Sequence, residues 1–136
     1  MIGLDTNVLV RYIMQDEAKQ SAKATKLIES LNSDNIGYIT TVSVIELYWV
    51  LTSSYALSEE QVAQALEMIL RTRQFLVERA DQVMRALRIF GDGRADFADC
   101  LIERSASGAG CNMTVTFDVK AAKHAGMTLL AWSDAG

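Results

Sequence analysis

Short aliphatic runs alternate along the chain with longer segments in which apolar residues recur at helical spacing. The short runs, rich in β-branched and aliphatic side chains, predict buried strands, and the longer amphipathic segments predict helices. Strands are expected at residues 1–4, 36–40, 74–77, 112–117 and 127–131, with helices between them at residues 7–14, 17–31, 43–54, 58–71, 81–90, 96–105 and 120–125.

This alternation is typical of an α/β fold. Strands short enough to be buried on both faces favour a mainly parallel central sheet of four to five strands, with helices on both faces as a three-layer domain. The chain has no proline, and no Ser/Gly-rich linker or repeat interrupts it. We therefore expect a single domain over residues 1–136.

Two aspartates follow strands of the predicted sheet. Asp5 comes after the first strand and Asp118 after the strand at residues 112–117. Ligands of parallel sheets bind at the carboxyl ends of strands, where two such carboxylates repel each other unless a cation lies between them. Each residue taken alone also fits an ordinary helix N-cap, so both interpretations stay open.

Glu46 is the only charged side chain between Asp34 and Glu59. Its neighbours are apolar, so we expect a buried helix with a buried carboxylate, which is costly unless a partner or a metal ion compensates the charge. The alternative is a capping box in which Glu46 pairs with Ser43 at the start of the helix.

Asp96 and Asp99 are three residues apart, which places them on one face of a helix near its N-terminus. A solvated acidic face is the alternative interpretation. Oxygen ligands of this kind suit Mg²⁺ or Mn²⁺, and such ions favour phosphodiester hydrolysis by a metal-activated water.

Composition narrows the chemistry further. The single histidine, His124, excludes a ribonuclease mechanism that needs a histidine pair and disfavours a His/Cys zinc site. Cys100 and Cys111 are interpreted as two buried thiols. The net charge of −4 is weak evidence against a nucleic-acid partner, because acids gathered at a metal site account for it. No run approaches the roughly 18 apolar residues of a membrane span, so we expect a cytoplasmic protein without membrane attachment.

Four segments together resemble the PIN-domain family, in particular its VapC-type toxin ribonucleases from prokaryotic toxin–antitoxin pairs. They are MIGLDTNVL at residues 1–9, VSVIEL at 42–47, DFADCLI at 96–102, and TFD at 116–118 with Ala122 and Gly126. The segments follow the family's order and span the chain, so their combination is more specific than any one of them. Residues 102–105 depart from the family, since Glu103 adds an acid there.

The resemblance implies a PIN-like fold and a metal-dependent endoribonuclease. It makes Asp5, Glu46, Asp99 and Asp118 the catalytic quartet around Mg²⁺ or Mn²⁺, with Asp96 as an additional ligand. Cleavage of RNA would leave 5′-phosphate and 3′-hydroxyl ends. The resemblance also implies a cognate antitoxin protein and a homodimer.

Polar and basic residues near these acids have implied supporting roles. Four side chains are expected to orient the carboxylates: Thr6, Asn7, Ser43 and Thr116. Four others are candidates to contact RNA phosphates: Arg11, Arg94, Arg104 and Lys120.

Two other classes compete with the nuclease. A non-catalytic Mg²⁺-binding switch of the receiver type needs an acidic pair after the first strand, but Thr6 follows Asp5. A phosphatase of the haloacid dehalogenase type needs an acid at position 7, which is Asn7. A PIN domain that serves only as a partner-binding module stays open, and measured hydrolysis separates it from the nuclease.

Overall fold

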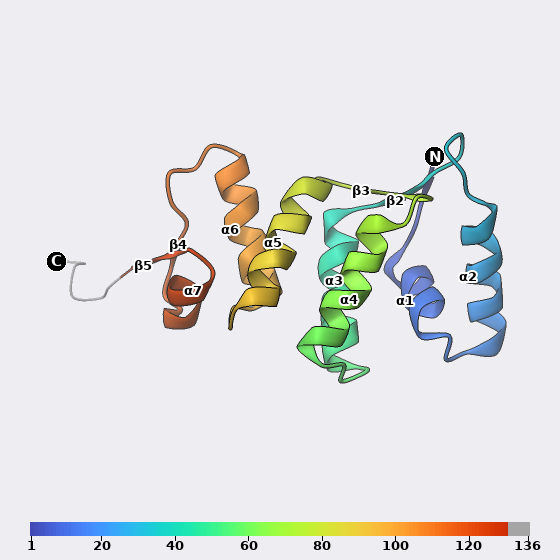
Figure 1. Ribbon diagram of the computed structural model, residues 1–136, viewed down its shortest axis with the longest axis horizontal. Helices are drawn as coiled ribbons and strands as arrows, with labels where there is room; N and C mark the ends of the chain where they lie inside the picture. Colours follow the sequence, from blue (N-terminus) through green and yellow to red (C-terminus); the bar gives the residue numbers. More distant parts are fainter. Residues whose placement is uncertain (131–136) are drawn as a thin grey trace. The chain divides into compact units, whose positions relative to one another are not determined.

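A computed structural model describes residues 1–130 of the chain (Figure 1). The chain divides into two compact units, the first from Met1 to Ala80 and the second from Asp81 onward. Each unit contains parallel strands connected by helices. The α/β class predicted from the sequence is therefore confirmed.

The first unit is built on a three-stranded parallel sheet. Its elements are β1 (Ile2–Gly3), α1 (Thr6–Met14), α2 (Ala18–Ser30), β2 (Gly37–Ile39), α3 (Thr41–Ser53), α4 (Glu59–Arg71) and β3 (Phe75–Val77). The strand order is β1-β2-β3, so each neighbouring pair is connected through two helices. This order brings the carboxyl ends of all three strands to one edge of the sheet.

The register of the sheet depends on a close approach at Gly37. This buried residue pairs with Ile2 on one side and Phe75 on the other. A Cβ atom at position 37 would lie 2.8 Å from Leu4 Cδ1 and 2.9 Å from Leu31 Cδ1, so a side chain would displace both leucines. The central strand can therefore lie against these two leucines only because position 37 has no side chain.

The helices of the first unit bury its core. Helix α1 packs against α2 and α3, and α4 packs against α3 and β3. Helix α4 begins with a capping box, in which Ser58 and Gln61 exchange hydrogen bonds. Several aliphatic side chains of these helices are almost fully buried: Leu9, Ile28, Leu47, Leu51, Val62, Leu66 and Ile69.

The described part of the second unit, which ends at residue 130, contains three helices and a pair of parallel strands. Its elements are α5 (Ala80–Asp92), α6 (Phe97–Gly108), β4 (Val115–Thr116), α7 (Val119–His124) and β5 (Thr128–Leu129). The rings of Phe90 and Phe97 meet edge to face with their centroids 5.9 Å apart, joining α5 to α6. Helix α7 contacts both strands. None of the helices in the described part of the chain is long and apolar enough to cross a membrane.

The structure refines several predicted elements. The strands were expected in one sheet of four to five, and among residues 1–130 they lie in a three-stranded and a two-stranded sheet. The strand expected at residues 112–117 is limited to β4, and the one at 127–131 to β5, with residue 131 outside the described residues. Helix α3 begins at Thr41, two residues earlier than predicted, because Thr40 is its N-cap.

The burial of Leu66 on α4 predicts how its substitution changes the free energy of unfolding. Leu66→Ala should lower the free energy of unfolding by about 2–5 kcal/mol, because it leaves a cavity where a side chain is only 2% exposed. Met68→Ala on the same helix, at a side chain that is 36% exposed, should cost less than about 1 kcal/mol. Urea unfolding of both variants measures the difference, and equal losses would contradict this description of the core.

Candidate functional site

A hydrogen bond connects the start of α1 to the middle of α3. Asp5 is the N-cap of α1, and its carboxylate accepts a bond from the backbone nitrogen of Thr6 at 2.7 Å. The hydroxyl of Thr6, a buried residue, donates to Glu46 Oε1 at 2.9 Å. Thr6 therefore holds Glu46 at the same end of the sheet as Asp5.

The surroundings of Glu46 differ from the prediction. Glu46 is exposed, and α3 is buried along one face only. The capping box with Ser43 is also wrong, because Thr40 caps the helix and donates from its Oγ1 to the hydroxyl of Ser43 at 3.3 Å. The apolar sequence around Glu46 suggested burial on all sides, whereas α1 and α4 cover α3 on one face and leave Trp49 46% exposed.

Asp5 and Glu46 line one cleft of about 660 Å³ in the first unit. Asn7 and Arg11 of α1 line it too, as does Tyr55 from the segment after α3. The cleft is thus lined by two carboxylates, a guanidinium and an aromatic ring.

Three aspartates lie close to one another in the second unit. Asp96 is the N-cap of α6 and accepts a bond from the backbone nitrogen of Asp99 at 3.2 Å. Asp118 is the N-cap of α7 and accepts bonds from the backbone nitrogens of Lys120 at 2.8 Å and Ala121 at 3.3 Å. Asp5, Asp96 and Asp118 therefore all cap helices, as the alternative interpretation of Asp5 and Asp118 allowed.

Asp99 does not cap a helix. Burial raises the pKa of its carboxyl group, and the charges of Asp96 and Asp118 raise it further, while Lys120 opposes them. Negative charge is therefore crowded around a half-buried carboxylate, which is the condition that a bound cation relieves.

The remaining predicted residues have varied contacts. Thr116 accepts a bond from the backbone nitrogen of Asp118 at 3.0 Å, which fixes the start of α7. Arg104 pairs with Glu103 at 2.5 and 3.0 Å. Arg94 is exposed in the segment between α5 and α6.

The sequence analysis missed Glu78. This residue directly follows β3, and its Oε1 accepts a bond from the backbone nitrogen of Thr41 at 2.8 Å. The bonds from Thr41 hold the pKa of Glu78 below its usual range. The rule that selected Asp5 and Asp118, an acid just after a strand, also applies to Glu78 and could have found it.

The cysteines do not support thiol chemistry. Cys100 is buried, and burial, followed by the charges of Asp96 and Asp99, raises the pKa of its thiol to about 11. Such a thiol stays protonated and unreactive at neutral pH. Cys111 was expected to be buried but is exposed, because it lies in the turn after α6 and packs under no helix.

The side chains of the predicted site residues suit Mg²⁺ or Mn²⁺, because most of their possible ligand atoms are carboxylate and hydroxyl oxygens. Among the described residues, no three acidic, histidine or cysteine side chains lie close enough together to form a metal-binding group. The crowding around Asp99 and the pairing of Glu46 with Thr6 are the local features that fit a cation.

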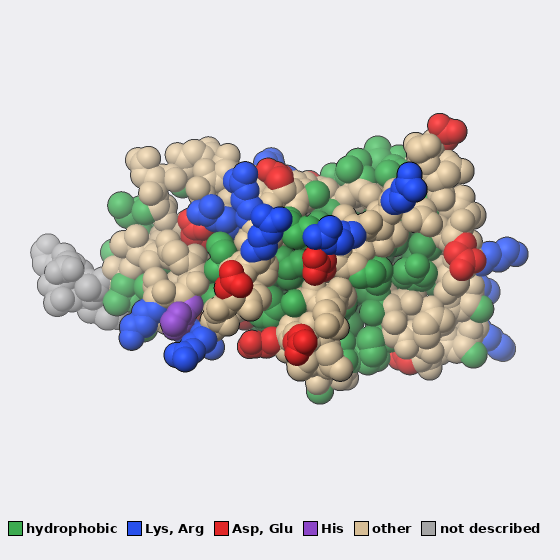
Figure 2. Space-filling view, viewed as in Figure 1, with side chains coloured by type: hydrophobic (Ala, Val, Ile, Leu, Met, Phe, Trp, Pro, Cys, Tyr) green, Lys and Arg blue, Asp and Glu red, His purple; other side chains and the backbone are tan. Residues whose placement is uncertain are grey.

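The surface carries both signs of charge. On the face drawn in Figure 2, acidic and basic side chains are interspersed with apolar ones. This distribution agrees with the nearly balanced composition of 13 basic and 17 acidic residues.

Comparison with known proteins identifies the family. The model of the PIN domain matches residues 2–127. The chain belongs to the PIN-domain family. This PIN domain is 25% identical over 114 residues to a protein named VapC ribonuclease from Aquifex aeolicus (strain VF5), and the match covers 84% of each chain. The resemblance stated from the four sequence segments is confirmed.

The raised pKa of Asp99 predicts how the free energy of unfolding depends on pH. The folded PIN domain binds this proton more tightly than the unfolded chain, so the free energy of unfolding should fall as pH rises above the usual aspartate range. Asp99→Asn removes the effect, so in EDTA the variant should gain stability relative to the wild type between about pH 4 and pH 7.

Urea unfolding across this pH range measures the gain. Asp34→Asn is the matched control, because Asp34 is an exposed carboxylate in the turn after α2. A gain for Asp99→Asn that does not grow with pH, or that the control shares, would show that charge is not crowded at Asp99.

Proposed function

We propose that this PIN domain is a metal-dependent endoribonuclease, the toxin of a toxin–antitoxin pair. Its catalytic carboxylates are Asp5, Glu46, Asp99 and Asp118. The same four residues, together with Asp96, bind Mg²⁺ or Mn²⁺. The observation that carries the proposal is the cleft in which Asp5 and Glu46 lie, with Glu46 held by Thr6.

The chain's own residues orient the oxygens. Thr6 donates to one oxygen of Glu46 and leaves the other free of that bond. Asp5, Asp96 and Asp118 each accept bonds from backbone nitrogens at helix N-termini, which fix their side chains and stabilise their negative charge.

When bound, Mg²⁺ or Mn²⁺ supplies an activated water and neutralises charge on the phosphate. The carboxylates place the scissile phosphodiester by holding the metal, and Lys120 lies close enough to Asp99 to lower the local negative charge. Hydrolysis in this way leaves 5′-phosphate and 3′-hydroxyl ends and does not require the 2′-hydroxyl. The preference for RNA rests on the relative named VapC ribonuclease.

The proposal includes partners and location. A toxic ribonuclease requires an inhibitor, so a cognate antitoxin protein is the expected partner, and a second copy of the chain completes a homodimer. The RNA substrate places the activity in the cytoplasm.

The proposal predicts metal-dependent RNA cleavage. Purified protein should cut a mixed pool of structured RNA in Mg²⁺ or Mn²⁺ and should not cut it in EDTA. Asp5→Asn and Asp118→Asn should each lower the cleavage rate at least about 100-fold, because losing a metal ligand removes several kcal/mol of transition-state stabilisation. Sequencing the product ends tests for the 5′-phosphate.

Asp34→Asn is the control, since it removes an exposed carboxylate that lies outside the four motifs. It should cleave at the wild-type rate. Cleavage that persists in EDTA, or that Asp118→Asn retains in full, would refute the nuclease and favour a PIN domain that only binds partners.

A further inference from the structure

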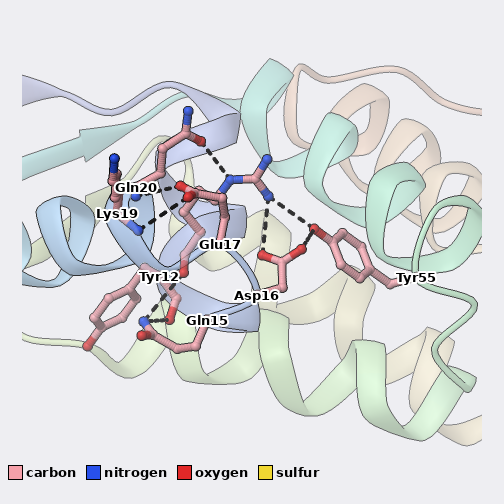
Figure 3. A network of polar contacts seen from close by, with 8 residues as sticks. Tyr12, Gln15, Asp16, Glu17, Lys19, Gln20 and Tyr55 are labelled. Carbon is pink, nitrogen blue, oxygen red and sulfur yellow. Dashed lines mark hydrogen bonds and ion pairs between the residues drawn. The ribbon is translucent and has the colours of Figure 1, made fainter.

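A polar network contains two residues that line the cleft of the first unit, Arg11 and Tyr55 (Figure 3). Arg11 donates from Nε to Gln20 Oε1 at 2.8 Å, and from Nη1 to Asp16 Oδ1 and to the hydroxyl oxygen of Tyr55, each at 3.2 Å. The Tyr55 hydroxyl donates in turn to Asp16 Oδ2 at 2.6 Å. The network therefore joins α1, the start of α2 and the segment after α3.

The network holds Tyr55 in one orientation. Its hydroxyl both donates and accepts, so neither the proton nor the oxygen is free for another role. The bond to Asp16 raises the pKa of Tyr55, and the same bond lowers the pKa of Asp16. Tyr55 thus stays a neutral phenol at physiological pH, with its ring as the part available to a ligand.

The backbone beside the network is strained at two points. Gln15 and Ala56, neighbours of Asp16 and Tyr55, have φ angles of 52° and 51°, in the left-handed region that non-glycine residues rarely adopt. Such conformations persist where surrounding contacts enforce them, and they cluster at functional sites.

Arg11 keeps part of its guanidinium available. Nε and Nη1 are engaged, whereas Nη2 makes no hydrogen bond within residues 1–130. Arg11 is one helical turn beyond Asn7 on α1, about 6 Å further along the helix. Both residues line the same cleft as Asp5 and Glu46.

We propose that Tyr55 and Arg11 form a nucleotide subsite of the cleft, in which the Tyr55 ring stacks on an RNA base and Arg11 Nη2 contacts the adjoining phosphate. The subsite rests on the proposed ribonuclease function, and it holds a nucleotide next to the cleaved bond. Asp16 is a positioning residue that fixes the ring and the guanidinium.

The chemistry of the cleft favours single-stranded RNA. An aromatic ring accepts any base by stacking, and a guanidinium binds a phosphate oxygen through hydrogen bonds. Val10 and Val50 add apolar lining beside the ring. A base held in this way brings the neighbouring phosphate toward the part of the cleft lined by Asp5 and Glu46.

Two substitutions at one position separate stacking from stability. Tyr55→Phe removes the hydroxyl and keeps the ring, whereas Tyr55→Leu removes both. The probe is an eight-nucleotide single-stranded RNA, with a matched set in which one nucleotide at a time is abasic. Fluorescence anisotropy in EDTA measures binding without cleavage, and circular dichroism measures the melting temperature of each variant.

Tyr55→Leu should weaken RNA binding about 5- to 150-fold, the range for loss of one base–aromatic stack, and Tyr55→Phe should keep most of the affinity. One abasic position should weaken binding to the wild type by a similar factor and should leave binding to Tyr55→Leu unchanged. In Mg²⁺, Tyr55→Leu should raise KM far more than it lowers kcat.

A purely structural network gives a different result. Tyr55→Phe and Tyr55→Leu would then lower the melting temperature alike, and neither would change the response to abasic RNA, which overturns the subsite. Equal RNA affinity in the wild type and Tyr55→Leu overturns it too, and assigns the ring to another ligand such as a protein segment.

The failure of the subsite is distinct from failure of the nuclease. If the wild type cuts RNA in Mg²⁺ but Tyr55→Leu binds and cuts equally well, the subsite is overturned and the proposed function stands. If the wild type neither binds nor cuts RNA, the proposed function fails and the subsite fails with it.

Discussion

The parallel pairing of β1 with β2 is the constraint on which the cleft depends. Because the two strands are parallel, the chain leaves both at the same edge of the sheet. Helices α1 and α3 therefore begin side by side. Thr6 can then reach Glu46 although 40 residues separate them. Gly37 permits this pairing, because a side chain there would meet Leu4 and Leu31. A shift in the register of this strand pairing would therefore separate Asp5 from Glu46.

The proposed function gives the acids of this chain a second role beside a structural one. Asp5, Asp96 and Asp118 cap helices, a role that stabilises the fold in the absence of any ligand. The same positions lie where backbone N–H groups and helix dipoles favour negative charge. Asp99 has no capping role, and the pKa of its carboxyl group is raised first by burial and then by the charges of Asp96 and Asp118. Structural and functional interpretations of such acids are therefore compatible.

Local patterns predicted more than long-range ones. The spacing of apolar residues predicted the helices, and the position of an acid just after a strand singled out Asp5 and Asp118. Both signals are local, because each depends on residues close together in the sequence. The exposure of Glu46 was not predictable, since it depends on which face of α3 is covered by α1 and α4. The network of Arg11, Asp16 and Tyr55 joins segments 39 residues apart, and no local pattern indicates it.

Mn²⁺ binding to the wild type, Asp99→Asn, Asp118→Asn and the double variant, measured by titration calorimetry, tests the proposed metal site in the second unit. If the carboxylates share their metal ions, each single substitution should weaken binding at least about tenfold, and the double variant should lose little more than either, because ligands of one ion are not additive. Unchanged Mn²⁺ affinity in either single variant, or losses that multiply as for independent sites, would contradict a shared metal site.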